Sequence, residues 1–560
     1  MAEPPQTTIA TRGAQMFPTL APEEMERLRR FGELRTFRAG EALATVGDPG
    51  IGLILVLNGE TEITQHDQTG RRTHIVTHQR GSFMGELAQL SGRPSLVDAH
   101  ALTDVEVVVI PPERLRALLI AEAELGERIM RALILRRVGL IESGAGPIII
   151  GPGDDADVLR LTNFLRRNGH PHQRLDPASD SCAQTLLDRF EIAVEELPIV
   201  LCPGGQLLRK PTEDAVARCI GLVGPIDPDR LFDVVVVGAG PAGLATAVYA
   251  GSEGLSVLVL DCRSFGGQAG ASARIENYLG FPTGISGMAL MGRAFNQAQK
   301  FGVEMAIPDE SVKLECGRDP CRLQLATGER VQARSVVIAT GARYRRLGVE
   351  RLDEFEGSSV HYWASPLEAD LAAGQEVVLV GGGNSAGQAT VFLASRARRV
   401  TLIARRPLDA TMSQYLIDRI HGLPNVDVVV GREVAALEGP AEALEAVTLR
   451  ERTSGSEVRH PARFLFSFIG AEPNTDWLAG SGLKLDERGF LLTGHEASEN
   501  GLPLETSRRG VFAVGDVRSG SVKRVAAAVG DGAQVVSAIH GYLAQPADSV
   551  LIQVEPQLVQ

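Results

Sequence analysis

The strongest constraint on the fold is the stretch 232–261, which reads FDVVVVGAGPAGLATAVYAGSEGLSVLVLD. Its run of valines predicts a strand that is buried on both faces. Gly238, Gly240 and Gly243 follow at G-x-G-x-x-G spacing, which permits a tight turn, close approach of a diphosphate, and packing of the next helix on the strand. That helix presents its N-terminus to the phosphates, and Asp261, about 20 residues on, can hydrogen-bond a ribose. Because all these signals agree, we expect a βαβ unit that binds a dinucleotide.

Length and composition predict several globular domains. A chain of 560 residues holds three or four, and the 44% hydrophobic and 22% charged content is typical of soluble proteins. A net charge of −13 argues against a general nucleic-acid binder. We find no apolar run long enough to span a membrane and no secretory signal, and expect a cytoplasmic protein. The six cysteines stand at positions 182, 202, 219, 262, 316 and 321. They form no C-x-x-C pair and show no metal-ligand spacing, so we expect no metal site.

A second glycine-rich unit begins at residue 376 and fits G-x-G-x-x-A. The position equivalent to Asp261 is Ala404, and Arg405 and Arg406 follow it directly. An acid here would repel a 2′-phosphate, whereas two arginines would bind it, so the pattern favours NADP. Two surface arginines without a ligand are the alternative. The residues expected at this site are Gly381, Gly383, Asn384, Ser385, Ala386, Arg405 and Arg406.

Residues 230–545 resemble the low-molecular-weight thioredoxin reductases. The resemblance rests on the fingerprint and on GGQ at 266–268, IENYLGFP at 275–282, ATG at 339–341 and GVFAVGD at 510–516. It implies a homodimeric flavoprotein in which hydride passes from NADPH to FAD. A positive group beside the flavin can stabilise its reduced form. The FAD site that the resemblance implies consists of Gly238, Gly240, Gly243, Asp261, Gly266, Gly267, Gln268, Asn277, Thr340, Gly341, Gly515, Asp516, Lys523, Arg524 and Val525.

The redox C-x-x-C of that family is missing. It should stand just before the second nucleotide unit, where residues 359–368 contain no cysteine. Tyr362, Trp363 and Ser365 occupy the interval and are candidates to lie beside the flavin, or they pack the domain junction. The resemblance therefore supports the fold and the cofactors but not disulfide chemistry.

We predict that electrons pass from the flavin directly to an acceptor such as a quinone, an iron–sulfur protein or oxygen. One alternative is a thioredoxin-disulfide reductase that uses Cys316 with Cys321 or Cys182 with Cys202. The other is a redox or nucleotide sensor without turnover. The sequence does not identify the acceptor.

Short apolar runs with glycine turns between residues 31 and 111 predict an antiparallel jelly roll. Within it, GSFMGELAQLSGR at 81–93 resembles the phosphate-binding cassette of cyclic-nucleotide-binding domains. The resemblance implies that Glu86 binds a ribose hydroxyl, that Arg93 binds the phosphate, and that the segment with Gly85 and Leu87 opens the cassette helix. Pro94 departs from the pattern, because proline has no N–H to donate. A barrel without a ligand is the alternative.

Two helices should follow at 112–142, the second more basic and with the charges of Arg136 and Arg137 on a solvated face. The order of strands and helices in residues 146–226 is similar to that of thioredoxin and glutaredoxin. Where those proteins carry their redox dithiol, this chain reads GPGDD at 151–155, so we expect a redox-inactive spacer or docking module. Cys182 and Cys202 are expected to be buried apolar residues.

The sequence thus predicts a multidomain chain that combines an antiparallel jelly roll, a thioredoxin-like α/β domain and two nested Rossmann-like α/β domains. The expected boundaries are a flexible leader at 1–20, a cyclic-nucleotide-binding-like domain at 21–143, a thioredoxin-like domain at 146–226, an FAD domain at 230–345 and 470–545, an NADPH domain at 346–469, and a tail at 546–560.

Overall fold

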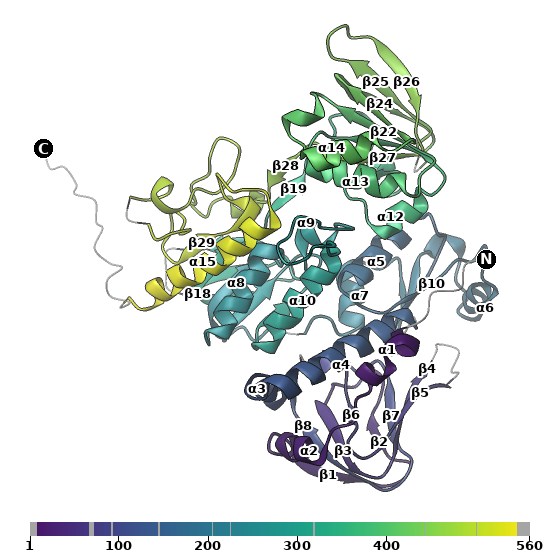
Figure 1. Cartoon of the computed structure of the whole chain (residues 1–560), viewed down its shortest axis with the longest axis vertical. Helices are drawn as coiled ribbons and strands as arrows, with labels where there is room; N and C mark the ends of the chain where they lie inside the picture. Colours follow the sequence, from purple (N-terminus) through teal and green to yellow (C-terminus); the bar gives the residue numbers. More distant parts are fainter. Residues whose placement is uncertain are drawn as a thin grey trace, which may run out of the picture.

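The computed structural model describes residues 8–66, 72–90, 93–143, 146–203, 205–224, 226–316, 320–441, 443–499 and 501–545. Four bodies are visible in Figure 1: an N-terminal β domain at the bottom, a middle domain beside it, an outer α/β domain, and an inserted α/β domain at the top. The outer domain is interrupted in sequence by the inserted one. A short two-stranded connection, β19 (Ala342–Tyr344) with β28 (Ala471–Pro473), joins them. The predicted tail lies outside the described residues.

The N-terminal domain is formed by two antiparallel four-stranded sheets, as the jelly-roll prediction requires. The first has the order β1 (Glu33–Phe37), β8 (Val105–Ile110), β3 (Leu53–Asn58), β6 (Phe83–Met84). The second has the order β2 (Ala42–Ala44), β7 (Asp98–Ala101), β4 (Thr61–His66), β5 (Arg72–His78), and the 3₁₀ helix η1 (Leu87–Leu90) follows β6. Three helices complete the domain, α2 (Pro22–Arg29), α3 (Pro112–Ala121) and α4 (Ala123–Glu142), the last two being the predicted pair.

The predicted flexible leader is partly helical, which corrects that expectation. Helix α1 (Thr8–Met16) packs on α4, and Met16 is only 1% exposed. The backbone N–H of Thr8 donates to Glu142 at 2.8 Å. Apolar Met16 fits over Gly139 of α4, where a side chain would meet the Met16 methyl group at 3.0 Å. Residues 1–7 lie outside the described residues.

The middle domain has a four-stranded sheet in the order β10 (Gln173–Leu175), β9 (Ile148–Ile150), β11 (Ile199–Leu201), β12 (Leu207–Arg209). Strands β9 and β10 are parallel, and β11 is antiparallel to both β9 and β12. Its helices are α5 (Ala156–Arg167), α6 (Ser181–Arg189) and α7 (Glu213–Cys219), with η2 (Val194–Glu196) before β11. Helix α5 begins after Asp155, whose carboxylate accepts the N–H groups of Asp157 and Val158.

A disulfide joins Cys202, at the end of β11, to Cys219, at the end of α7. Cys202 is buried, as expected of it, but its sulfur is bonded rather than a free apolar group. The pairing of Cys182 with Cys202 that the sequence left open is therefore wrong. Nothing is described of the Cys182 side chain.

The outer domain carries a mostly parallel sheet with helices packed on one face. The strand order is β15 (Glu304–Ala306), β14 (Val257–Leu260), β13 (Leu231–Val237), β18 (Arg330–Ile338), β17 (Cys321–Leu325), β16 (Ser311–Glu315), and β29 (Val511–Ala513) pairs with β18. In the described sheet, β17 runs antiparallel to both of its neighbours, β16 and β18, and the other strand pairs are parallel. Helices α8 (Pro241–Ser252), α10 (Gly287–Lys300) and α15 (Val525–Leu543) share a core with alternate residues of β13 and β14. The shorter helices are α9 (Gly267–Gly270), η4 (Asp476–Leu478), η5 (Gly494–Glu496) and η6 (Gly515–Val517).

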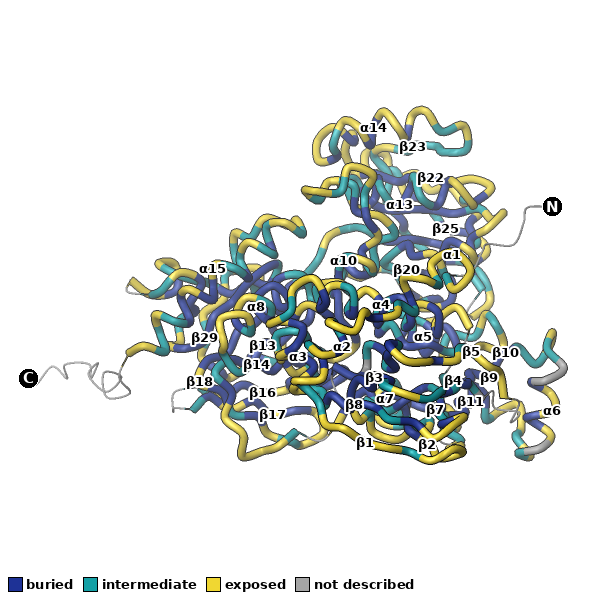
Figure 2. Tube along the Cα trace, turned by 60° about the horizontal axis from the view of Figure 1, so that its bottom comes forward, coloured by how far each residue is buried: buried dark blue, intermediate teal, exposed yellow. Residues whose placement is uncertain are grey.

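The inserted domain has an all-parallel sheet in the order β20 (Val360–His361), β27 (Phe464–Ser467), β21 (Glu376–Val380), β22 (Arg399–Ala404), β23 (Val426–Val430). The antiparallel strands β24 (Arg432–Glu438), β25 (Ala446–Glu451) and β26 (Glu457–Pro461) form a second sheet. The helices are α11 (Leu352–Phe355), α12 (Pro366–Leu371), α13 (Asn384–Ala394), α14 (Gln414–His421) and η3 (Leu408–Ala410). The valine run of β13, residues 234–237, and all of β14 are buried, as the sequence predicts, and both strands lie inside the outer domain in Figure 2.

Candidate dinucleotide and effector sites

The turn between β13 and α8 leaves no room for side chains, as a phosphate-binding turn requires. Gly238 has a φ of +113°, and a Cβ there would lie 2.2 Å from the Ala339 carbonyl oxygen. A Cβ on Gly243 would lie 1.8 Å from the Gly238 carbonyl oxygen. Gly240 caps α8 without a side chain, so the N-terminal amides of the helix stay open to an anion. The geometry fits a bound diphosphate.

Asp261 stands at the end of β14 and already accepts three backbone hydrogen bonds. Its Oδ2 accepts the N–H of Ala239 at 2.8 Å. Its Oδ1 accepts the N–H groups of Arg263 and Ser264 at 3.0 and 3.1 Å. The carboxylate therefore fixes the phosphate turn to the following loop, and a ribose hydroxyl would share its remaining lone pairs.

The loop after β14 brings the next predicted FAD residues to the same turn. Gly267 lies against Gly240, since a Cβ on Gly267 would be 3.0 Å from the Gly240 Cα. Gln268 donates through Nε2 to the Ala342 carbonyl, and Thr340 donates through Oγ1 to the Asn474 carbonyl at 2.9 Å. These residues gather near the carboxyl ends of β13 and β18, where open α/β sheets bind ligands. Asn277, by contrast, is exposed.

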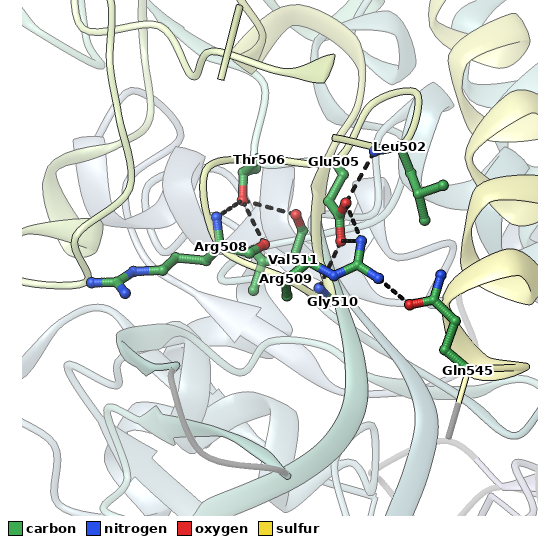
Figure 3. Close-up of polar contacts among 8 residues, drawn as sticks. All are labelled: Leu502, Glu505, Thr506, Arg508, Arg509, Gly510, Val511 and Gln545. Atoms are coloured by element: carbon green, nitrogen blue, oxygen red, sulfur yellow. Dashed lines mark hydrogen bonds and ion pairs between the residues drawn. The ribbon is translucent and has the colours of Figure 1, made fainter. Parts of the chain in front are cut away.

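A buried glutamate holds the loop that leads into β29 and on to Asp516. Figure 3 shows Glu505 at the centre of this loop, with Arg509 and the backbone of Gly510 and Leu502 around it. Glu505 is 1% exposed and accepts from Arg509 Nη1 at 2.7 Å, from the Gly510 N–H at 3.0 Å and from the Leu502 N–H at 3.1 Å. The glutamate thereby fixes the position of β29, which precedes Asp516 in the chain.

Beyond β29 the chain places a carboxylate and an ammonium together. Burial raises the pKa of Asp516, and Lys523 partly opposes that rise. Lys523 donates through Nζ to the Asp516 carbonyl at 2.6 Å. Gly515 lies in the same turn, Arg524 is the N-cap of α15, and Val525 is its first residue. These five predicted FAD residues thus form one short segment.

The inserted domain repeats the glycine turn between β21 and α13. Gly381 has a φ of +153°, and Gly383 caps α13. Asn384 accepts the Ser413 N–H through Oδ1 at 2.7 Å, so it orders the neighbouring loop. Arg405 and Arg406 are both exposed directly after β22. Neither arginine has an ion-pair partner or side-chain hydrogen bond among the residues that the structure describes.

The cysteine-free interval 359–368 belongs to the inserted domain, where it runs from β20 into the start of α12. Trp363 lines a cavity of about 280 Å³ together with Gln268 and Tyr344 of the outer domain and Ser385 of the inserted domain. Its indole Nε1 donates to Glu368 Oε1 at 3.0 Å.

The other two flavin-proximal candidates make different contacts. Tyr362 donates to Glu356 and stacks on Tyr344, with ring centroids 6.3 Å apart. Ser365 is buried and accepts a hydrogen bond from Arg166 of the middle domain at 2.7 Å. Only Trp363 of the three candidates lines the cavity between the domains.

Cys316 directly follows β16, and Cys321 is the first residue of β17, so both lie at the turn end of this hairpin. They pack with Val235 and Val237, on the sheet face opposite to the one that α8 and α10 cover. Contact with Cys321 and burial both raise the pKa of the Cys316 thiol. A thiol with a raised pKa is a poor nucleophile at neutral pH.

The N-terminal domain encloses a cavity of about 500 Å³ with a mostly apolar lining. Five buried polar side chains line it, of which Glu86 and Arg136 carry the charges; the others are His78, Gln89 and Ser95. Arg136 donates through Nε to the Met16 carbonyl at 2.9 Å and through Nη1 to the Gly85 carbonyl at 2.8 Å. Among the described residues, its Nη2 and Glu86 Oε1 are buried without hydrogen-bond partners. Burial lowers the pKa of Arg136 to about 9.

The expected solvated face of α4 is therefore wrong at two positions. Arg136 is 8% exposed, because it enters the barrel beneath α1. The Arg137 side chain is also largely buried: Nη1 lies 3.4 Å from Glu86 Oε2, and Nε donates to the Gly169 carbonyl at 3.1 Å. Arg137 thus connects the cassette to the middle domain.

Arg93 does not line the barrel cavity, contrary to the role that the cassette resemblance implies. It lines a cleft between α4 and α10 instead, with its guanidinium carbon 5.9 Å from the Phe295 ring centroid. Leu87 lines the same cleft. The neighbouring Pro94 packs on Gly221 of the middle domain, where a Cβ would be 2.5 Å from the proline ring, so this packing draws the loop toward the interface.

Comparison with known proteins agrees with this architecture. Residues 232–532 match the pyridine nucleotide-disulphide oxidoreductase family, and residues 34–122 match the cyclic nucleotide-binding domain family. The chain is 32% identical to a thioredoxin reductase of Listeria innocua over 304 residues, which are 54% of this chain and 91% of that protein. It is 32% identical to a bifunctional thioredoxin reductase/thioredoxin of Mycobacterium leprae over 327 residues, covering 58% and 69%.

Solved structures show the same similarity. A T. acidophilum thioredoxin reductase superposes with a TM-score of 0.52 at 30% identity, over 57% of this chain and all of that chain. A Lactococcus lactis thioredoxin reductase gives a TM-score of 0.52 at 26% identity, over 56% and 99%. Within the described residues, no helix has the length and apolar character needed to cross a membrane. With more than half of its length matched, the chain belongs to the pyridine nucleotide-disulphide oxidoreductase family, as a flavoprotein oxidoreductase with FAD and NADPH as cofactors and a fused cyclic nucleotide-binding domain.

Proposed function

We propose that this enzyme uses NADPH to reduce an external acceptor through FAD, without a protein dithiol as intermediate. The observation that carries the proposal is the interval 359–368, which contains no cysteine and places Trp363 in the cavity between the two nucleotide domains. When bound, the two cofactors supply hydride and electron transfer. The alternative pair, Cys316 and Cys321, packs on the other sheet face.

The chain's own part is to bind, orient and shield the cofactors. For FAD we propose the turn at Gly238–Gly243, the loop at Gly266–Gln268 and the segment at Gly515–Val525. For NADPH we propose the turn at Gly381–Ala386, with Arg405 and Arg406 for the 2′-phosphate. Asn277, which the resemblance also assigns to FAD, is exposed.

The test measures NADPH-driven reduction of ferricyanide and of oxidised thioredoxin by the full chain, before and after alkylation with iodoacetamide. We expect brisk ferricyanide reduction that survives alkylation and little turnover of thioredoxin. A variant with Cys182, Cys262, Cys316 and Cys321 changed to serine keeps the Cys202–Cys219 disulfide and is the matched control for alkylation. Rapid thioredoxin reduction by the parent chain that this variant lacks would mean that a cryptic cysteine pair carries the electrons.

A chain that binds FAD and NADPH but reduces neither acceptor nor oxygen would instead be a sensor. Stopped-flow spectra distinguish this case, because the flavin would be reduced once and stay reduced. Such a result would exclude turnover while leaving the cofactor sites intact.

We also propose that the N-terminal cavity binds a cyclic nucleotide that regulates the enzyme. Glu86 and Arg136 support this, because each presents a buried, unpartnered atom in the cavity. A ribose hydroxyl would satisfy the carboxylate oxygen, and a phosphate would satisfy the guanidinium. Arg136 thus takes the phosphate-binding role that the cassette resemblance assigned to Arg93.

Calorimetry with cAMP and cGMP tests the effector proposal. We expect Arg136→Gln to abolish binding and Arg93→Gln, the matched arginine outside the cavity, to leave it unchanged. The absence of heat and of a thermal shift at millimolar ligand would mean a barrel without this ligand. Binding that leaves NADPH kinetics unaltered would exclude regulation of the flavin site.

We further infer that residues 146–226 are a thioredoxin-like module that serves as a docking element. The strand order β10-β9-β11-β12 and the absence of cysteine at 151–155 support this inference. A homodimer and a cytoplasmic location stay predictions. Light scattering of the purified chain tests the first, and fractionation of the source cells tests the second.

A further inference from the structure

The C-terminal end of α5 inserts an arginine of the middle domain into the dinucleotide turn of the outer domain. Arg167 donates through Nη2 to the Gly267 carbonyl at 2.8 Å. The next residue, Asn168, donates through Nδ2 to the Arg263 carbonyl at 3.1 Å. Helix α5 lies against the outer domain in Figure 1, so both residues reach the loop that follows β14.

The Arg167 guanidinium lies where the backbone already favours an anion. Gly267, which accepts its hydrogen bond, packs on Gly240 at the N-terminus of α8. The free amides and the dipole of that helix attract negative charge. A second positive group at this point would be unfavourable unless an anion lies between them.

Among the described residues, Arg167 has no carboxylate within ion-pair distance. The charge of Asp261 partly opposes the effect of burial on the pKa of Arg167, but the oxygens of that carboxylate accept the N–H groups of Ala239, Arg263 and Ser264. Burial lowers the pKa of Arg167, and its Nε is buried without a hydrogen-bond partner among the described residues. An anion bound nearby would satisfy this unused donor and would offset the cost of burying the guanidinium.

We propose that Arg167 binds the diphosphate of FAD, so that the middle domain completes the cofactor site of the outer domain. A guanidinium suits this role because it can donate two hydrogen bonds to one phosphate group. The proposal requires only that FAD binds at the β13–α8 turn, and it does not depend on the identity of the electron acceptor. The middle domain would then contribute to cofactor binding although it lacks redox cysteines.

The competing explanation is that Arg167 only docks the two domains, as Asn168 does. The full-length holoenzymes of Arg167→Gln and Asn168→Ala separate the two roles, because the second loses a docking hydrogen bond but no charge. FAD affinity is measured from the flavin fluorescence released on dilution, and ADP and adenosine are compared as competitors for FAD rebinding. Adenosine lacks the diphosphate and is the matched ligand control.

We expect Arg167→Gln to weaken FAD and ADP binding by about 10- to 150-fold, which is the range for the loss of one charge-assisted hydrogen bond. The affinity for adenosine should be unchanged. Asn168→Ala should change all three by less than about threefold. Equal weakening of ADP and adenosine, or equal effects of the two variants, would overturn the proposal.

If Arg167→Gln does not fold, the parent chain still gives an answer. Phenylglyoxal labels accessible arginines, and mass spectrometry reports the labelling of Arg167 in the flavin-depleted chain with and without added ADP. Protection by ADP but not by adenosine is expected. Arg167 that is labelled equally under all conditions would overturn the proposal.

Discussion

Coenzyme choice gives the most quantitative prediction. Arg405 and Arg406 follow β22 without partners in the described part of the chain, so both are available to a 2′-phosphate. A hydrogen bond to a charged group is worth about 1.5–3 kcal/mol. Since both side chains are exposed and screened by solvent, the lower value applies, and the pair should contribute about 3 kcal/mol. The double variant Arg405→Ala/Arg406→Ala should therefore lose about 150-fold in kcat/KM for NADPH.

Anaerobic stopped-flow reduction of the flavin is the assay. The double variant should keep its rate with NADH, because NADH has no 2′-phosphate for these arginines to bind. Arg398→Ala is the matched control: it is an exposed arginine before the other end of β22, paired with Glu376 at 3.1 Å. Equal reduction rates with low NADH and NADPH in the parent chain, or an unchanged preference in the double variant, would refute the reasoning.

Three further predictions concern stability. Glu505→Ala should cost about 2–4 kcal/mol in denaturant unfolding, because it leaves the N–H groups of Leu502 and Gly510 without their acceptor, whereas the half-exposed Arg509 stays solvated; an unchanged midpoint would contradict the role of the loop in Figure 3. Burial and Arg136 lower the pKa of His78 to about 3, below its ordinary 6.5, so the unfolded chain binds more protons and stability falls as the pH drops from 6.5 toward 3. The loss should reach about 2 kcal/mol at pH 5 and be absent in His78→Phe, and equal acid sensitivity of the two chains would exclude His78 as the source. Reduction of the Cys202–Cys219 disulfide, which closes a separation of 17 residues, should cost about 3 kcal/mol, measured by unfolding with and without a reductant.

Local signals were enough for the nucleotide turns. The valine run before Gly238, the glycine spacing and the following helix act within about 30 residues, so neighbours in sequence determine the geometry. The alternating pattern of the N-terminal domain likewise predicts its sheets, because each strand has one buried face. The cofactor residues themselves stay predictions.

The two arginines that matter most at the interfaces were not predictable in this way. Arg136 and Arg167 each stand in an L-R-R-x-G sequence near the end of an amphipathic helix, where helical periodicity places charges in solvent. The hydrogen bonds that hold Arg136 reach Met16 and Gly85, which are 120 and 51 positions away in the sequence. The one that holds Arg167 reaches Gly267, 100 positions away. The Cys202–Cys219 disulfide was not predictable for a similar reason, since cysteine positions in the sequence do not determine which cysteines pair.

Helix α5 also contacts the inserted domain, where Arg166 donates to Ser365 and Asn163 donates to Glu368 at 3.3 Å. Glu368 is 1% exposed, so its carboxylate depends on these neighbours for hydrogen bonds and for compensation of its charge. One short helix thus satisfies buried polar groups in two other domains at once. Unfolding the middle domain would leave those groups without partners, so its free energy of unfolding is shared with both nucleotide domains. Its thermal transition should therefore coincide with theirs, and a chain trimmed to the reductase portion should melt at a lower temperature than the same portion within the whole.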